Sequence, residues 1–439
     1  MTTAVTRRGL LKTAAAFAAP TFIPATALGR DGAIPPSERV TMGFIGCGRQ
    51  TYFKNIPLFV RTRGVQAVAV CDVDRWRLAN AIPQIKSQYD SGKAKGTFTQ
   101  VDQYEDYQDL LARDDIDAVC IATPDHWHAE MAIDAMRAGK DVALEKPIIR
   151  TIRQGQDLVR VAKQTGRIFR VDSEFRSGMP AHRATTLVRN GYVGKVRRVV
   201  TSVPETDIPC PPQPEMPVPK ELNFQRWQGP APKVPYTTLG VHPHQDYSRP
   251  GWMRRLLYCD GMITNWGTHL CNGAMWATDT ERTGPVEIKG TGTYPDRESF
   301  WNVLLNFQVD FRFADGLRWE YRTESPYLLI EGDEGWVRAG FREIDAHPKS
   351  LLTVKPKPTD QSFRFKSEKQ DFIDCVRDRS ETLEPAEVGH RVTSLGLLAH
   401  IAIHSGRSLQ WDPDKEIFVN DDDANAYLDQ PIQHRPNDA

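Results

Sequence analysis

The stretch GFIGCG, residues 43–48, ends an apolar run with two glycines, Gly46 and Gly48, that are one residue apart. At such glycines, backbone amides can approach a pyrophosphate because no Cβ atom stands in the way. The third glycine of the full dinucleotide-binding fingerprint is absent, since Thr51 occupies its position. The stretch alone is also compatible with a simple tight turn, so the sequence around it has to decide.

The sequence from residue 38 to residue 172 alternates short apolar runs with amphipathic stretches. The runs are RVTMGFIG, GVQAVAVCD, IDAVCIATP, DVALEKP and RIFRVDSEF, and the stretches between them include HAEMAIDAMRAG and RQGQDLVRVAKQTG. Strands that are buried on both faces and joined by helices indicate a doubly wound parallel sheet. We therefore predict an α/β fold with a Rossmann domain over 38–172, whose ligand binds at the carboxyl ends of the strands.

A carboxylate, Asp72, ends the second run, 24 residues after Gly48. At that position it would accept hydrogen bonds from the adenosine ribose hydroxyls and would repel a 2′-phosphate. We therefore expect NAD, while the nearby Arg75 leaves NADP as an alternative. Arg49 and Gln50, which follow the two glycines, join the expected cofactor-binding set.

Polar residues also follow the third and fourth runs. Thr123 and Pro124 precede a helix that carries His128, and Glu145 and Lys146 end the strand in DVALEKP. A charged pair at the end of a central strand is costly unless it meets a ligand or a partner. We expect all five residues to border the cofactor, with Lys146 as a proton-transfer group. The alternatives are an exposed salt bridge for Lys146 and a satisfied hydrogen bond at a helix start for His128.

In the order and spacing of these pieces, the chain resembles the Gfo/Idh/MocA family, which includes glucose-fructose oxidoreductase and inositol dehydrogenase. The residues that carry the resemblance are Gly46, Gly48, Asp72, Ala122-Thr123-Pro124 with His128, and Glu145-Lys146-Pro147. The resemblance covers nearly the whole chain after the leader. It implies a bound nicotinamide cofactor, a sugar or cyclitol substrate, and a homo-oligomer, dimer or tetramer, formed through the sheet of a second domain.

After residue 172 the pattern changes to that of an α+β domain, which we place at 173–420 and follow with a tail at 421–439. A helix in HRATTLVRNGYVG and a strand in KVRRVVTSV come first, and a proline-rich stretch follows. Because this stretch contains Trp227, we expect it to be an ordered loop over a pocket or at an oligomer contact. The alternating segments GPVEIKGTGTY, WNVLLNFQVDFRF, LRWEYRTE and YLLIEGDEGWVRAG then predict a large, mostly antiparallel sheet. The resemblance implies that the late helices, in QDFIDCVRDRS and HRVTSLGLLAHIAIHSG, pack back on the first domain.

The segment GMITNWGTHLCNGAMWATD, residues 261–279, predicts a helix with Asn265 and His269 on one side. In the resembled family, an acidic residue stands four positions before this histidine, and another frequently stands three positions after it. Here Asn265 and Asn272 occupy those positions, so the chain departs from the pattern at both carboxylates. An amide can hydrogen-bond but cannot take up a proton. Lys146 and His269 therefore remain the proton-transfer candidates, and Asn265 is expected to orient the substrate.

Three further residues are candidates for substrate binding. Arg176 and Glu174 follow the last strand of the first domain and are placed to reach substrate hydroxyls, and the Trp266 ring could stack on a sugar. No cluster with metal-ligand spacing is found in the sequence, so we expect no metal. The 56 Lys and Arg balance the 56 Asp and Glu, which gives no reason to expect a nucleic-acid partner.

The first 30 residues resemble a twin-arginine export signal, in which the arginine pair of TRRGLLK precedes an apolar run too short and proline-broken to span a bilayer. We exclude residues 1–30 from the fold and expect a periplasmic or secreted protein without a membrane span.

Free NAD is scarce outside the cytoplasm. Besides a net dehydrogenase, two functions therefore stay open: a redox-neutral enzyme that retains NAD and cleaves or epimerises a glycoside, and a nucleotide-binding scaffold without turnover.

Overall fold

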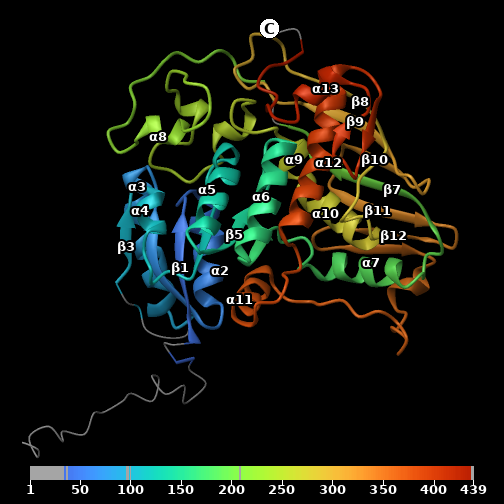
Figure 1. The fold of residues 1–439 in the computed structure, drawn as a ribbon, viewed down its shortest axis with the longest axis horizontal. Coiled ribbons are helices and arrows are strands. Elements are labelled where there is room, and N and C mark those ends of the chain that lie inside the picture. The colour runs from blue at the N-terminus through green and yellow to red at the C-terminus, as the bar shows by residue number, and fades with distance from the viewer. Residues whose placement is uncertain (1–33, 36–37, 95–97, 99, 207–208, 437–439) are drawn as a thin grey trace, which may run out of the picture.

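The computed structural model of the chain describes residues 34–35, 38–94, 98, 100–206 and 209–436. The predicted export signal at 1–30 lies outside the described residues. Two α/β domains lie side by side, the first drawn in blue and teal and the second mostly in green to orange (Figure 1). Within the described ranges, no helix has the length and apolar composition that crossing a membrane requires.

The first domain is built on a six-stranded parallel sheet with the order β3-β2-β1-β4-β5-β6. Its strands are β1 (Val40–Ile45), β2 (Val65–Cys71), β3 (Asp102–Tyr104), β4 (Ala118–Ile121), β5 (Asp141–Glu145) and β6 (Phe169–Asp172). Its helices are η4 (Thr51–Asn55), α2 (Ile56–Arg61), α3 (Arg75–Asp90), α4 (Tyr107–Leu111), α5 (Asp125–Arg137) and α6 (Ile152–Thr165). Strands β4 and β5 are buried at every residue, as their continuous apolar runs predict. The doubly wound sheet is confirmed.

The edge strand β3 is the part of this sheet that the sequence does not reveal. It consists of only three residues, DQY, none of which is buried. Because it lies at the edge and lacks an apolar run, neither periodicity nor hydrophobicity marks it.

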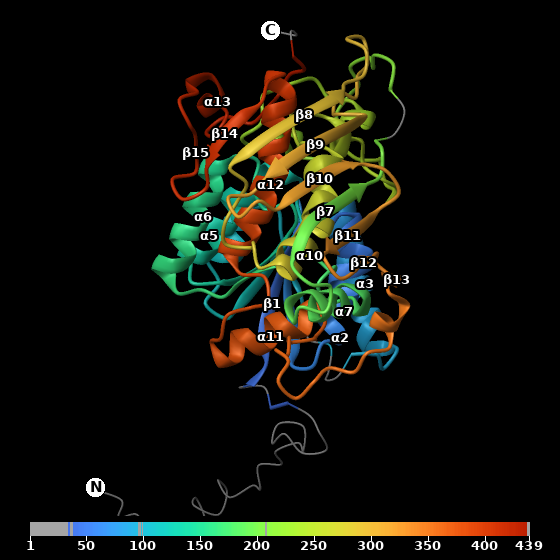
Figure 2. The same cartoon turned by 90° about the vertical axis from the view of Figure 1, so that its right-hand side faces the viewer.

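The second domain contains a nine-stranded sheet with the order β13-β12-β11-β7-β10-β9-β8-β14-β15, which faces the viewer in Figure 2. Its strands are β7 (Val196–Val203), β8 (Glu287–Thr293), β9 (Asn306–Arg312), β10 (Arg318–Thr323), β11 (Tyr327–Gly332), β12 (Trp336–Ala339), β13 (Ile344–His347), β14 (Leu409–Asp412) and β15 (Ile417–Phe418). The pairing is antiparallel except between β7 and β10, so the sheet is mixed but mostly antiparallel, as predicted. Along β9, buried and exposed residues alternate strictly.

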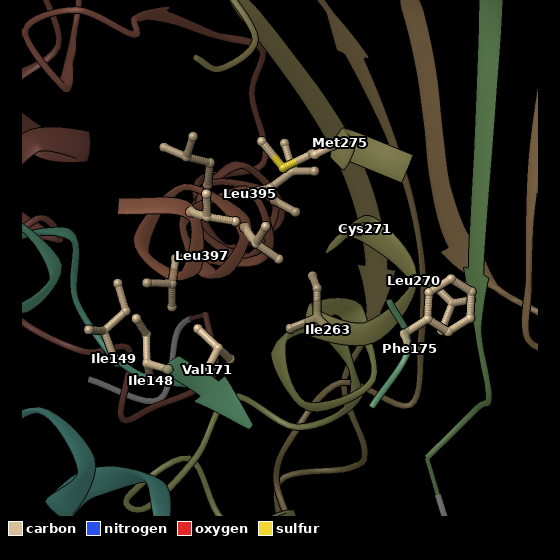
Figure 3. Close-up of a cluster of buried hydrophobic side chains, with 14 of the residues drawn as sticks. Ile148, Ile149, Val171, Phe175, Ile263, Leu270, Cys271, Met275, Leu395 and Leu397 are labelled. Atoms are coloured by element: carbon tan, nitrogen blue, oxygen red, sulfur yellow. The ribbon is translucent and has the colours of Figure 1, made fainter. Parts of the chain in front are cut away.

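Helices α7 (Met179–Arg189), α10 (Gly267–Thr278) and α12 (Ala386–Ser405) pack against this sheet. The other helices that follow the first domain are α8 (Phe224–Gln228), η5 (Thr238–Gly240), η6 (Gly251–Arg254), α9 (Met262–Asn265), η7 (Lys349–Leu352), α11 (Glu368–Asp378) and α13 (Asp422–Ala426). Figure 3 shows Leu395 and Leu397 of α12 among side chains from both domains, with Ile149 on one side and Ile263 and Met275 on the other. The apolar residues of α12 therefore join the two domains in one core.

The last segment, 421–439, was predicted to be a tail, but the part of it that the structure describes is packed on the fold. Leu428 and Ile432 are only 3% and 5% exposed. The Leu428 carbonyl accepts a hydrogen bond of 2.9 Å from the backbone N–H of Arg153, in the first turn of α6. Two apolar residues in a polar segment give no periodic signal, which explains why the sequence does not predict this packing.

A buried ion pair fastens α11 to the first domain. Arg170 of β6 and Asp371 of α11 are each 1% exposed and lie 3.0 Å apart. We expect Asp371→Ala to lower the free energy of unfolding by about 3–5 kcal/mol, because it leaves the arginine charge buried without this partner. Asp374→Ala, on the same helix, removes a partly exposed pair with Lys366 and should cost at most about 1 kcal/mol. Denaturant titration of both variants measures the difference, and equal losses would contradict this account.

Candidate active site

A cavity of about 680 Å³ lies at the carboxyl ends of the first domain's strands, and both domains line it. The second domain contributes the region of α9 and segments around α8 and η6. The predicted residues on its wall are Gly46, Gly48, Arg49, Gln50, Asp72, Thr123, Pro124, His128, Glu145, Lys146, Asn265 and Trp266. The structure thus brings the expected cofactor set together with the lysine and two residues of the second domain.

Gly46 and Gly48 of GFIGCG lack a side chain for different structural reasons. Gly46 has a φ of 86°, and a Cβ atom there would lie 2.7 Å from the carbonyl oxygen of Ala122 at the end of β4. A Cβ atom on Gly48 would meet no atom within 4 Å, because it would point into open space. The hydroxyl of the buried Thr51, at the position of the missing third glycine, donates to the Gly46 carbonyl. The threonine therefore braces the loop that the glycines form.

Asp72 lies where a ribose would be bound. Its Oδ2 accepts a hydrogen bond of 2.6 Å from the Cys47 backbone N–H, and its Oδ1 accepts one of 2.8 Å from that of Asp74. Burial, followed by the charge of Asp74, raises the pKa of Asp72 to about 6. At neutral pH it is therefore mostly a carboxylate, and its remaining lone pairs can accept ribose hydroxyls.

Lys146 and Asn265 meet across the cavity. Lys146 directly follows β5, and its Nζ donates a hydrogen bond of 3.1 Å to Oδ1 of Asn265, the last residue of α9. Both side chains are half-buried on the cavity wall. The amide orients the amine without being able to exchange a proton with it.

Glu145, one residue earlier, points into a buried polar cluster. Its Oε1 accepts hydrogen bonds from Gln50 Nε2 at 2.9 Å and from Asn55 Nδ2 at 3.1 Å. Lys369 of α11 forms a buried ion pair with Asp172 beside it. Burial, followed by the charge of Asp172, raises the pKa of Glu145 to about 7. The cluster holds Gln50 at the cavity wall and connects α11 to the segment after β1 that contains Gln50 and Asn55.

His128 holds two strand ends in place. Its Nδ1 lies 2.7 Å from the Pro147 carbonyl oxygen and its Nε2 lies 2.8 Å from that of Thr123. Burial lowers the pKa of His128 to about 4, so the ring is neutral near pH 7. Because a neutral imidazole has one N–H, the ring donates to one of these two carbonyls. This matches the alternative of a satisfied histidine at a helix start, although the residue also borders the cavity.

His269 lies behind the cavity wall. The side chain is 9% exposed, its Nδ1 lies 3.1 Å from Ser173 Oγ, and its ring packs edge-on against Trp266 and Phe341. Burial, followed by the charge of Lys146, lowers the pKa of His269 well below its usual value. The imidazole is therefore neutral, and it is not among the residues that line the cavity.

The structure does not bring Arg176 and Glu174 to the cavity. Arg176 is 1% exposed, donates from Nε to Asn272 Oδ1 at 2.6 Å, and forms an ion pair of 2.8 Å with Glu281. Its guanidinium thus joins α10 to the loop after β6. Glu174 is exposed and lies outside the cavity lining.

A part of the second domain covers the cavity, and we call it the roof (residues 219–254). It includes part of the proline-rich stretch, for which the sequence predicts an ordered loop over a pocket or at an oligomer contact. The roof is bonded to the first domain, because the Asn223 backbone N–H donates to the Val73 carbonyl at 2.9 Å and His242 Nε2 lies 2.9 Å from Asp74 Oδ2. In Figure 1 the roof, with α8, lies over the upper end of the first domain's sheet. In the sequence, the tryptophans within and after the proline-rich stretch are the signal that this region is ordered.

Asp125 lines the cavity but is not among the site residues predicted from the sequence. It is the first residue of α5 and is 4% exposed. Burial raises the pKa of its carboxyl to about 8, against the opposing charges of Lys146 and Arg150. Its position between Pro124 and His128, two predicted site residues, is the feature of the sequence that points to Asp125.

The residues fit a dinucleotide cofactor. Open space at Gly48, next to the start of a helical segment at Arg49, suits a pyrophosphate, and Asp72 suits a ribose. Fold and site together define an NAD-binding oxidoreductase. The family model "Oxidoreductase family, NAD-binding Rossmann fold" matches residues 40–173, and "Oxidoreductase family, C-terminal alpha/beta domain" matches residues 211–437. The chain belongs to this Gfo/Idh/MocA family, and NAD as the cofactor is confirmed. Among the described residues, no cluster of His, Cys, Asp and Glu is arranged to hold a metal ion.

Curated relatives share part of the chain. A "Glycosyl hydrolase family 109 protein 1" from Shewanella sp. (strain MR-4) is 33% identical over 162 residues, which is 37% of this chain and 34% of the relative. A "Glycosyl hydrolase family 109 protein" from Shewanella baltica (strain OS195) matches to the same extent. The match thus spans about a third of the length of these relatives.

Solved structures share the fold over most of the chain. The aldose-aldose oxidoreductase from Caulobacter crescentus, complexed with glycerol, has a TM-score of 0.60 at 19% identity and covers 85% of this chain and 99% of its own. The WlbA dehydrogenase from Bordetella pertussis, in complex with NADH and UDP-GlcNAcA, has a TM-score of 0.61 at 18% identity with the same coverage. At this identity, the likeness concerns the fold.

We expect substitution of Gly48 to weaken NAD binding and substitution of Gly46 to lower the stability of the fold. Gly48→Val should weaken NAD binding at least about tenfold, because the side chain fills the space for the pyrophosphate, and it should leave the stability of the NAD-free protein within about 0.5 kcal/mol. Gly46→Ala should instead destabilise the fold, because its φ is positive and its Cβ would contact the backbone. Calorimetry with NAD and thermal unfolding measure both. Unchanged NAD affinity in Gly48→Val would contradict the placement of the pyrophosphate.

Proposed function

We propose that the protein is an exported enzyme that oxidises or reduces a secondary hydroxyl of a sugar, a cyclitol or a derivative, with NAD in the cavity. The observation that carries this proposal is the position of Lys146. Its amine faces the cavity at the end of β5 and is held by Asn265 of the other domain at 3.1 Å. Bound NAD supplies a two-electron hydrogen acceptor.

The residues around Lys146 divide the remaining tasks. The Lys146 amine takes the proton of the substrate hydroxyl and returns it to the carbonyl oxygen in the reverse direction. Asn265 holds the amine in place. The neutral His269, whose ring packs against Trp266, is the partner or relay of Lys146. The half-buried Trp266 ring offers a face on which a sugar ring can stack.

A redox-neutral reaction with a retained cofactor is the second candidate. The hydrogen bonds of the roof to the first domain favour it, because NAD beneath the roof could leave only after these contacts open. The names of the glycosyl hydrolase relatives also support it. In this reaction, the hydroxyl is oxidised transiently, the acidified neighbouring C–H allows the glycosidic bond to break or the centre to invert, and the carbonyl is reduced again.

Cofactor content separates the candidates. The mature protein, purified without added nucleotide and then denatured, should release about one NAD or NADH per chain if the cofactor is retained. Incubation with methyl glucosides, methyl galactosides and myo-inositol then distinguishes cleavage from net oxidation. A nucleotide-free protein that needs added NAD at every turnover would exclude the redox-neutral candidate, and nucleotide binding without turnover of any sugar would favour a scaffold.

Export and assembly are the remaining proposals. We infer a periplasmic or secreted homo-oligomer, a dimer or tetramer, formed through the outward face of the nine-stranded sheet. On that face, Arg198 pairs with Glu320 at 2.7 Å and with Glu331 at 2.6 Å, so the interface would be polar. Cell fractionation and sedimentation of the purified protein test these points, and a cytoplasmic monomer would contradict both.

Lys146→Ala should reduce kcat on any sugar that the protein turns over by about 10²- to 10⁴-fold, because it removes the principal acid–base group. Lys163→Ala is a matched control, since Lys163 is an exposed lysine of α6 that pairs with Glu387 at 3.3 Å. Its kcat should be that of the unchanged protein. Full turnover by Lys146→Ala would show that the proposed mechanism is wrong.

A further inference from the structure

An irregular loop of the roof, which lies between η5 and η6 and which we call the strap (residues 242–250), borders the cavity beside the predicted pyrophosphate position. Residues 248–250 of the strap line the cavity, and Gly48 and Arg49 line it from the first domain. The two sides are bridged, because Arg49 Nη1 donates a hydrogen bond of 2.7 Å to the Tyr247 carbonyl. The strap is therefore attached to the first domain next to the glycine at which a pyrophosphate fits.

The Tyr247 ring packs among aromatic side chains of the first domain. It stacks on Tyr52, with 4.3 Å between the ring centroids and 16° between the ring planes. The rings of Trp76 and Phe53 lie 5.0 Å and 5.7 Å away, and the Arg77 guanidinium lies 5.1 Å from the centroid of the Tyr247 ring. These four partners come from η4 and from the start of α3, which follow β1 and β2. One side chain thus fastens the strap to two elements of the first domain.

Arg77 and His242 fix the backbone around this ring. Arg77 is 4% exposed, and its Nη2 donates to the carbonyls of Asp246 at 3.0 Å and Pro243 at 3.2 Å. At the beginning of the strap, His242 Nε2 lies 2.9 Å from Asp74 Oδ2. The first domain therefore determines the course of the strap on both sides of the stacked ring.

The ring of Tyr247, and not its hydroxyl, makes these contacts. The hydroxyl oxygen is buried and has no hydrogen-bond partner among the residues that the structure describes. A buried hydroxyl without a partner is costly, whereas stacking and the burial of the ring are favourable. The attachment of the strap by Tyr247 should therefore depend on the aromatic ring alone.

We propose that the stack of Tyr247 on Tyr52 is the latch that retains NAD in the cavity. The proposal rests on the proposed function and deepens its second candidate, because a redox-neutral enzyme needs a cofactor that does not leave between turnovers. The strap and Gly48 line the same cavity, and the Arg49 bridge joins them. NAD bound there leaves only after the two rings separate, so their contact sets the rate of NAD release.

The test measures NAD release and needs no sugar. Each variant is equilibrated with isotopically labelled NAD and diluted into a large excess of unlabelled NAD, and the label that stays bound is followed over time by rapid filtration. Tyr247→Ala should release the label at least about tenfold faster than the wild type, because it removes the stacked ring. Tyr247→Phe should stay within about twofold of the wild type, because it keeps the ring and loses only the unpartnered hydroxyl.

A second variant approaches the same contact from the first domain. Tyr52→Ala should also accelerate release, and the double variant should stay within about twofold of Tyr247→Ala, because both substitutions break one contact. Trp336→Ala is the control. It removes one ring of a stacked pair with His347, whose centroids lie 6.4 Å apart outside the cavity lining, and it should release NAD at the wild-type rate.

Two results would overturn the proposal: a wild-type release rate in Tyr247→Ala, or a double variant in which the two single effects multiply. Circular dichroism of the NAD-free variants checks folding, and if Tyr247→Ala does not fold, Tyr52→Ala alone has to accelerate release about tenfold. If Tyr247→Ala releases NAD faster but the wild type turns over no sugar, the proposed function fails and the latch stands. Sugar turnover together with a release rate that is indifferent to Tyr247 would leave the function standing and refute the latch.

Discussion

The hydrogen bond between Lys146 and Asn265 is the contact on which the site depends, because it joins the two domains at the cavity wall. Lys146 sits where it does because β5 is a central, fully buried parallel strand, so its end meets the ends of β1 and β4 at one edge. Asn265 is held there by α9, which packs against α12. The apolar side chains of α12 fix the distance between the domains, and thereby the geometry around the lysine.

The cofactor half of the site could be predicted from the sequence because it depends on local signals. Gly46, Gly48, Asp72 and Lys146 each follow an apolar run, and parallel strand ends necessarily meet. The substrate half could not be predicted in the same way. Arg176 follows β6 just as directly, but its guanidinium turns toward Asn272 and Glu281 in the core, a long-range contact that no local pattern records.

The same distinction explains the roof and Asp125. The tryptophan in the proline-rich stretch predicts an ordered loop, over a pocket or at an oligomer contact. Its place over this cavity follows from hydrogen bonds such as the one from Asn223 to Val73, which joins residues 150 positions apart. The burial of Asp125 on the cavity wall is likewise not visible in the TPDHWH segment.

The central claim is that hydrogen passes between a sugar carbon and NAD held in this cavity. The direct measurement uses purified protein with its bound cofactor, mixed with sugars of the panel that carry deuterium on the ring carbons and quenched within the first turnover in cold organic solvent at mildly alkaline pH, where NADH is stable. Mass spectrometry of the released nucleotide should find reduced cofactor that is one mass unit heavier than NADH. Conversion of the labelled sugar with the cofactor remaining unlabelled and oxidised at every time point would contradict the account.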